Sequence, residues 1–178
     1  MKGLDDMEIL DLYTKDRIRT GKTMIRGEQP PKGYYRMVVT VCIFNSNGEL
    51  LIQQRQTFKE GWPNMWDLSV AGSAIAKESS HIAAQRELAE ELGYVYSFED
   101  MRATLTVSFD EGFVDIYIIE ENVDINALTL QYEEVQAIRW AKQNEVLSMI
   151  DNKSFIPYHK ALIEYLFYMR NHKGTHVK

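Results

Sequence analysis

Residues 76–94 read AKESSHIAAQRELAEELGY and gather Glu87, Glu90 and Glu91 near the end of a predicted helix. Side chains at helix positions i, i+3 and i+4 share one face, so the three carboxylates crowd together. Each repulsive pair costs about 0.2–0.5 kcal/mol, and a negative charge in the last turn opposes the helix dipole by roughly 0.3–1 kcal/mol. One interpretation is a solvated acidic face. The other is a bound divalent cation such as Mg²⁺, which prefers oxygen ligands and reverses the repulsion.

The ends and the inner side of this helix are also marked in the sequence. Ser79 or Ser80 suits the N-cap position, and Gly93 suits the C′ position. The predicted apolar side consists of Ile82, Ala83, Ala84, Leu88, Ala89 and Leu92. The pattern therefore predicts one amphipathic helix with a carboxylate cluster at its C-terminal end.

A longer motif surrounds the cluster. From Gly72, five residues lead to Glu78 and seven more to Arg86, followed by Glu-Leu-Ala-Glu-Glu-Leu-Gly-Tyr. This order resembles the Nudix box, G-x5-E-x7-R-E-U-x-E-E-x-G-U with U aliphatic, at all seven fixed positions. A chance match is on the order of one in a billion per starting point. The departures are Tyr94, which occupies an aliphatic position, and Lys77, which precedes the first glutamate where glycine is common.

The resemblance to the Nudix family extends over roughly residues 7–140 and points to the subgroup related to isopentenyl-diphosphate isomerase. It implies the Nudix fold, an α/β/α sandwich in which a mixed sheet lies between helices, with the box forming a loop-helix-loop. It also implies a hydrolase that cleaves a diphosphate linked to another group, often in a nucleoside diphosphate derivative. The expected cofactor is Mg²⁺, with Mn²⁺ as an alternative.

The resemblance also implies roles for the residues of the box. Glu87, Glu90 and Glu91 are the expected metal ligands, and the backbone carbonyl near Gly72 completes the set. Glu78 and Arg86 are expected to form a charge pair that fixes the helix against its loop. The general base is either Glu87 or a glutamate of a later loop. The candidates outside the box are Glu133 and Glu134, followed by Glu111 and Asp115, and each of these four has a structural role as its alternative.

Substrate contacts are predicted outside the box. A guanidinium group matches a phosphate in a bidentate manner, which makes Arg26, Arg36 and Arg55 candidates for the diphosphate. Three aromatic residues, Tyr34, Tyr35 and Trp62, are candidates for stacking on a base. For each of these six the alternative is a core, loop or surface role.

The whole chain limits the possible partners. Its 178 residues are expected to form a single domain, 1–178, with a core at about 35–150, an N-terminal hairpin and a C-terminal helix at 157–172. The net charge of −6 gives no basic surface for nucleic acid or an anionic membrane. Cys42 is expected to be a buried strand residue. Without a leader or membrane-spanning run, a cytoplasmic protein is expected, and a homodimer stays open.

Strands are predicted on both sides of the box. Residues 7–14 and 15–27 resemble two short strands around a polar turn, and 34–44 with 48–55 a hairpin. The further expected strands are 65–72, 101–109, 113–120 and 135–141, and the further helices are 144–150 and 158–173.

Three rival functions remain open at this point. An isomerase is disfavoured because Ala71 and Ser73 stand where the related isomerases carry cysteine and histidine. A binding module without turnover is the second rival, although every carboxylate of the box is retained. An RNA-processing enzyme such as a cap hydrolase is the third, and the acidic balance weighs against it.

Overall fold

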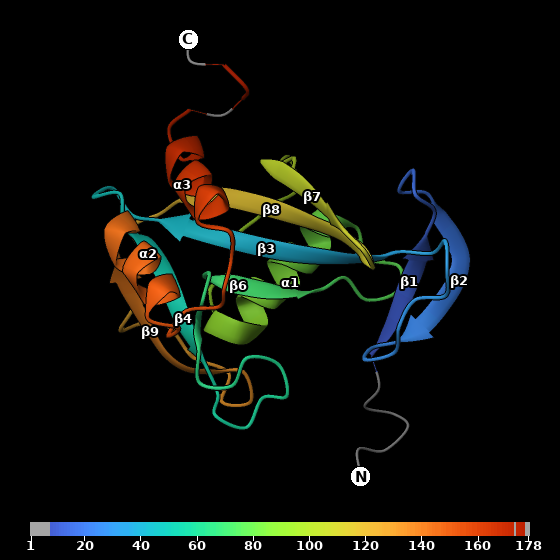
Figure 1. Cartoon of the computed structure of the whole chain (residues 1–178), viewed down its shortest axis with the longest axis horizontal. Helices are drawn as coiled ribbons and strands as arrows, with labels where there is room; N and C mark the ends of the chain where they lie inside the picture. Colours follow the sequence, from blue (N-terminus) through green and yellow to red (C-terminus); the bar gives the residue numbers. More distant parts are fainter. Residues whose placement is uncertain (1–7, 173, 177–178) are drawn as a thin grey trace.

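The computed structural model describes residues 8–172 and 174–176 (Figure 1). The elements are β1 (Ile9–Tyr13), β2 (Arg19–Ile25), β3 (Arg36–Phe44), β4 (Leu50–Arg55), β5 (Trp66–Asp67), β6 (Val70–Ser73), α1 (Ser80–Leu92), β7 (Leu105–Phe109), β8 (Gly112–Glu120), β9 (Val135–Ala141), α2 (Gln143–Asp151) and α3 (Lys160–Met169). No helix of the described part of the chain is long and apolar enough to cross a membrane.

Seven of the strands form one mixed sheet. Its central path runs β5-β4-β3-β8-β7, while β6 also pairs with β3 and β9 with β4. Strands β3 and β8 are parallel, from Arg36 opposite Gly112 to Phe44 opposite Glu120, and the other pairs are antiparallel. Strands β1 and β2 form a separate antiparallel hairpin.

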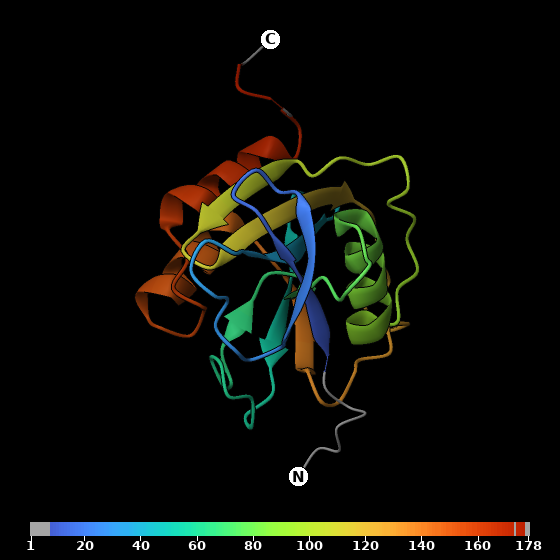
Figure 2. The ribbon, with the colours of Figure 1, turned by 90° about the vertical axis from the view of Figure 1, so that its right-hand side faces the viewer.

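Helices cover both faces of the sheet (Figures 1 and 2). Helix α1 packs on one face over a core that includes Val39 and Val41 of β3. Helices α2 and α3 pack on the other face over a second core, to which β3 contributes Cys42 and Phe44. The alternation follows from the two-residue period of a strand buried on both sides. The predicted α/β/α sandwich with a mixed sheet is confirmed, and Cys42 is fully buried as expected.

The predicted hairpin of residues 34–44 and 48–55 is only partly correct. Strands β3 and β4 share a turn but pair only at Phe44 and Leu50. Further along, the hydroxyl of Ser69 lies between them, since it donates to the carbonyl of Leu51 at 2.6 Å and accepts from the N–H of Ile43 at 2.9 Å. Strand β6 then takes the place beside β3. The insertion of Ser69 between these strands also explains why residues 65–72, predicted as one strand, form two strands, β5 and β6.

Helix α1 begins and ends as predicted, but its inner side differs. Ser79 is the N-cap residue, and Gly93 ends the helix in the left-handed region at φ 64°. Ile82, expected on the apolar side, is 49% exposed. Two glutamates, Glu87 and Glu91, lie on the buried side with the alanines and leucines. The hydrophobic pattern missed them because charged residues are rarely buried without a partner.

An ion pair joins the N-terminal hairpin to the sheet. Arg17 in the β1–β2 turn contacts the buried Asp115 of β8 at 2.6 Å and donates to the hydroxyl of Thr106 at 3.1 Å. Thr106 in turn donates to Asp115 at 2.7 Å. These contacts hold the hairpin against strands β7 and β8.

Candidate active site

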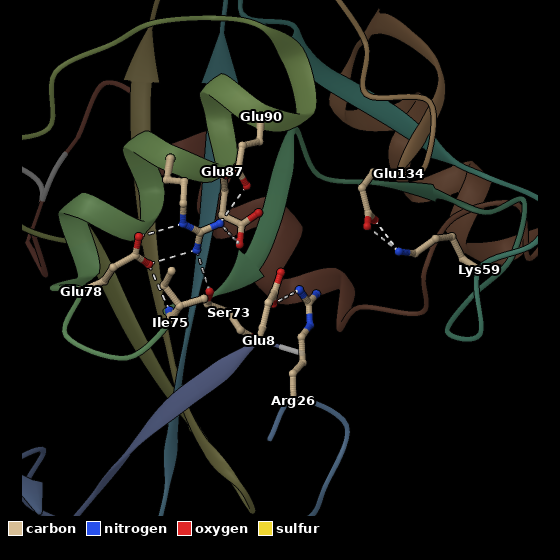
Figure 3. A network of polar contacts seen from close by, with 10 residues as sticks. Glu8, Arg26, Lys59, Ser73, Ile75, Glu78, Glu87, Glu90 and Glu134 are labelled. Atoms are coloured by element: carbon tan, nitrogen blue, oxygen red, sulfur yellow. Dashed lines mark hydrogen bonds and ion pairs between the residues drawn. The ribbon is translucent and has the colours of Figure 1, made fainter. Parts of the chain in front are cut away.

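The polar network around Ser73, Glu78 and Glu90 (Figure 3) is centred on Arg86 of α1, which donates to all three. Its Nε and Nη2 donate to the two carboxylate oxygens of Glu78 at 2.8 and 3.0 Å, and Nη2 also donates to the carbonyl of Ser73 at 3.0 Å. Glu78 additionally accepts from the backbone N–H of Ile75 at 3.0 Å. The expected charge pair is therefore present, and it ties the loop after β6 to the middle of α1.

The same guanidinium group also faces the carboxylate cluster. Arg86 Nη1 lies 2.9 Å from an oxygen of Glu90 and 3.1 Å from Glu87 Oε1. Burial alone would lower the pKa of Arg86, but its contacts with Glu78, Glu87 and Glu90 raise it. Arg86 stays charged and relieves part of the repulsion among the carboxylates.

Two carboxylates of the cluster are buried. Glu87 is 6% and Glu91 4% exposed, whereas the side chain of Glu90 is half exposed. Burial raises the pKa of Glu87 despite Arg86. Burial, and then the neighbouring Glu87, raise the pKa of Glu91 well above its ordinary value, although Gln53 donates to it at 2.9 Å. The two charges are therefore incompletely compensated by the protein.

Gly72 lies directly against the cluster. A Cβ atom at this position would lie 2.0 Å from the carboxylate carbon of Glu87. Gly72 is opposite Val39 in the β6–β3 pair, so the sheet fixes its backbone. The absence of a side chain at Gly72 therefore leaves room for the carboxylate of Glu87 against the backbone of β6.

The donor set fits a hard divalent cation. Glu87 Oε1 is buried and has no hydrogen-bond partner, since the approach of Arg86 lacks hydrogen-bond geometry. Carboxylate and carbonyl oxygens are the ligands that Mg²⁺ and Mn²⁺ take. Among the residues that the structure describes, no three His, Cys, Asp or Glu side chains already converge on one point. Arg86 holds Glu90, and Gln53 holds Glu91, so a bound ion would require small side-chain shifts.

Two loops bring further predicted residues to the other side of this region. Glu134 pairs with Lys59 at 2.6 Å, and both face the box from the opposite side in Figure 3. Arg55 donates to the carbonyl of Gly61 at 3.0 Å and lies 3.9 Å from Asp67. The N–H of Gln56, next to Arg55, donates to the carbonyl of Glu134 at 3.0 Å, so the end of β4 and the loop before β9 lie side by side.

Other predicted residues make their contacts elsewhere. Arg36 contacts Glu111 at 3.5 Å, and the ring of Tyr35 packs on Phe113 at 5.5 Å. Both lie against the β7–β8 hairpin. Asp115, a further candidate for the base, is bound to Arg17 as described above. Trp62 is 50% exposed in the loop after β4, and Tyr34 lies under the ammonium group of Lys22.

Some polar residues of the site were not predicted. Gln53 and Asp67 lie side by side on β4 and β5, and both are buried. In the sequence, each is marked only as a polar residue inside an apolar strand.

Arg26, which the sequence analysis named as a candidate for binding phosphate, pairs with Glu8. Burial would lower the pKa of Arg26, but Glu8, then Glu87 and Glu134, raise it. Figure 3 shows Arg26 beside Glu8, beneath the box.

Several known proteins are similar to this chain in sequence and in fold. A model of the NUDIX domain matches residues 34–165. An uncharacterized Nudix hydrolase of Listeria monocytogenes is 45% identical over 170 residues, covering 96% of this chain and 99% of that one. A solved structure from Deinococcus radiodurans superposes with a TM-score of 0.71 at 22% identity, covering 89% of this chain and 97% of that one.

The chain belongs to the Nudix family. A weaker similarity links it to an isopentenyl-diphosphate Delta-isomerase of Shigella boydii, which is 31% identical over 117 residues, or 61% of this chain and 63% of that one. The predicted family, the Nudix fold and the class of pyrophosphohydrolase enzyme are thereby confirmed.

Proposed function

We propose that the chain hydrolyses a diphosphate linkage in a nucleoside diphosphate derivative or a related small molecule, with Mg²⁺ or Mn²⁺ as cofactor. The observation that carries this proposal is the pair of buried glutamates, Glu87 and Glu91, one helical turn apart. Their charges repel in a buried position, and Glu87 Oε1 accepts no hydrogen bond, although Arg86 lies 3.1 Å from it. Arg86 offsets the charge of Glu87 only in part, so a divalent cation that joined both carboxylates would stabilise their charged forms.

The proposed metal ligands are Glu87, Glu90 and Glu91, with the carbonyl of Gly72. A bound divalent ion would neutralise the diphosphate and lower the pKa of a water molecule. Glu78 and Arg86 act as positioning residues, because their bidentate pair fixes the loop before α1. Arg86 also donates a hydrogen bond to the carboxylate of Glu90 and so keeps it close to Glu87.

The phosphate groups of the substrate require cations from the protein. Arg26 pairs with Glu8, and Figure 3 shows both side chains beneath the box. Arg55 ends β4, and Lys59 lies in the loop that follows it, across from the box. Together these three residues can face a diphosphate from the side opposite the carboxylates.

The general base is proposed to be Glu87 rather than Glu134. Glu87 retains a buried oxygen without a hydrogen-bond partner. Glu134 accepts a hydrogen bond from Lys59 at 2.6 Å, whereas Glu87 Oε1 lies near Arg86 without accepting a hydrogen bond from it. A base must be within hydrogen-bonding distance of the water that it deprotonates, and the box carboxylates lie nearest the proposed ion.

The isomerase alternative is less well supported. Cys42, the one cysteine in the sequence, packs in the core under α2 and α3. The carboxylates of α1 lie on the other face of the sheet. Burial also raises the pKa of the Cys42 thiol, which opposes thiolate formation.

The test is phosphate-bond cleavage across nucleotide sugars, dinucleoside polyphosphates, nucleoside triphosphates and isoprenoid diphosphates. Each is measured with Mg²⁺, with Mn²⁺ and with chelator. Turnover should require the metal and be lost in Glu91→Gln, while Glu164→Gln, an exposed glutamate of α3, keeps it. Intact substrates throughout, combined with tight binding of one of them that is indifferent to Glu91→Gln, would instead show a binding module.

A further inference from the structure

Two exposed aromatic rings meet beside the candidate active site. Phe58 is 56% and Tyr132 71% exposed, yet their ring centroids lie 5.9 Å apart at an interplanar angle of 43°. The two residues come from loops more than seventy positions apart in the sequence. Of the four largely exposed aromatic residues in the described chain, Phe58, Trp62 and Tyr132 all lie on these two loops. Exposed apolar rings that gather in one place commonly mark a binding site.

The backbone holds the two loops together. The N–H of Gln56 donates to the carbonyl of Glu134 at 3.0 Å, and Lys59 pairs with the same residue through its side chain at 2.6 Å. The amide of Gln136 donates to the carbonyl of Arg55 at 2.9 Å. The ring pair is therefore carried by a fixed framework of strand ends.

The same framework is connected to the box. The N–H of Gln131, next to Tyr132, donates to the carbonyl of Glu91 at 3.0 Å. Lys59, next to Phe58, carries a cation toward the region that contains Glu134 and Arg26. The rings therefore share one pair of loops with Lys59 and Glu134, and the loop that carries Tyr132 is hydrogen-bonded to α1 at Glu91.

The geometry points to Phe58 and Tyr132 as the subsite that binds the nucleobase of the substrate by stacking. The tilted pair leaves a planar ring room to lie on one face and against the edge of the other ring. This inference rests on the proposed function, because it assigns the group attached to the diphosphate. It makes the substrate a nucleotide derivative rather than an isoprenoid diphosphate.

The test uses ligands that need no hydrolysis. Isothermal titration with Mg²⁺ compares the four common nucleoside monophosphates with ribose 5-phosphate, which carries the same phosphate and sugar without a base. Phe58→Ser and Tyr132→Ser should each weaken the tightest nucleotide about tenfold. Tyr132→Phe should retain the affinity, as should Tyr168→Ser, a change at an exposed ring on α3. Ribose 5-phosphate should bind equally to all variants.

Three results would overturn the inference. The first is unchanged nucleotide affinity in both serine variants. The second is an equal loss for ribose 5-phosphate, which would show a general disturbance of the loops. The third is a wild-type dimer that dissociates in Phe58→Ser, which would make the rings a contact between copies. Base-dependent binding without any metal-dependent turnover would uphold the subsite and reject only the proposed hydrolysis.

Discussion

The carboxylate of Asp11 accepts a hydrogen bond from the backbone N–H of Lys77 at 2.8 Å. Lys77 has a φ of 76°, in the left-handed region, at the box position where glycine is common. A side chain there costs roughly 1–2 kcal/mol. The neighbouring N–H of Ala76 donates to the carbonyl of Ile9 at 2.7 Å, and Arg19 donates to the carbonyl of Glu78. The N-terminal hairpin therefore holds the strained turn from which Glu78 reaches Arg86.

Asp11→Ala is accordingly expected to lower the unfolding free energy by about 1–3 kcal/mol and to reduce kcat. Lys77→Gly in the Asp11→Ala background should restore most of both, because glycine adopts this φ without strain. Asp16→Ala, at an exposed aspartate in the turn of the same hairpin, is the control and should have little effect. Denaturant unfolding and steady-state kinetics provide the measurements. Failure of Lys77→Gly to restore kcat would show that Asp11 acts in some other way.

Gly72→Ala should abolish most activity while leaving the chain folded. The added Cβ would displace the carboxylate of Glu87, and a shift of about 1 Å in a catalytic group can cost about a hundredfold in rate. Gly61→Ala is the matched control, because a Cβ there meets nothing within 4 Å. Circular dichroism checks the fold, and kcat with Mn²⁺ affinity checks the site. Normal Mn²⁺ binding in Gly72→Ala would contradict the proposed position of the ion.

Glu87→Gln and Glu134→Gln separate the two candidates for the base. Loss of a general base reduces the rate by about 10²–10⁴-fold, so Glu87→Gln should fall in this range. Glu134→Gln removes an ion pair with Lys59 and should change kcat/KM by less than about fivefold. The comparison requires kcat and KM for both variants at several pH values. The assignment would be reversed by two results together. Both variants would lose kcat equally, and only Glu134→Gln would lose the acidic limb of the profile of kcat against pH.

Mg²⁺ should stabilise the folded chain even without substrate. A ligand at a hundred times its Kd adds about 2.7 kcal/mol to the unfolding free energy. This gain should disappear in Glu91→Gln and persist in Glu164→Gln. Thermal melts over a series of Mg²⁺ concentrations measure it. An equal gain in Glu91→Gln would remove Glu91 from the set of ligands.

Asp67 is expected to make stability depend on pH. Burial raises its pKa above the ordinary value of 3.8, despite hydrogen bonds from Tyr158 and Leu68 and the nearby Arg55. The folded state then binds the proton more tightly, so this contribution to stability is present at low pH and is lost as pH rises through the raised pKa. Asp67→Asn cannot titrate. Its stability relative to wild type should therefore grow from about pH 4 upward, by at most about 1.4 kcal/mol per pH unit.

Urea unfolding of both proteins between pH 4 and 8 measures this difference. Asp100→Asn, at an exposed aspartate, provides a baseline. A difference that is constant over this range would show that Asp67 is charged throughout.

The sequence predicted those features that depend on neighbours in the chain. The spacing of the box set both ends of α1, and the apolar run at Val135–Ala141 matched β9 at both ends. Gly93 adopts the left-handed conformation that its place after the helix indicated. In each case the signal and the structure lie within a few residues of one another.

Features that depend on a third segment escaped prediction. The separation of β3 from β4 requires the hydroxyl of Ser69, which belongs to neither strand. The burial of Glu87 and Glu91 requires Gly72 and Gln53 from two other strands. Arg36 and Tyr35 looked suitable for phosphate and base, but the β7–β8 hairpin holds them. Residue type alone does not indicate which surface a strand end will face.

The bond between Asp11 and Lys77 has a consequence for protein engineering. Residues 34–165 match the family model, and the hairpin lies outside this range. A chimera that received only residues 72–94 would inherit a lysine in a glycine conformation without the carboxylate that holds it. The conformation of the box in this chain therefore depends on the N-terminal hairpin, and a functional transplant must include residues 9–25 as well.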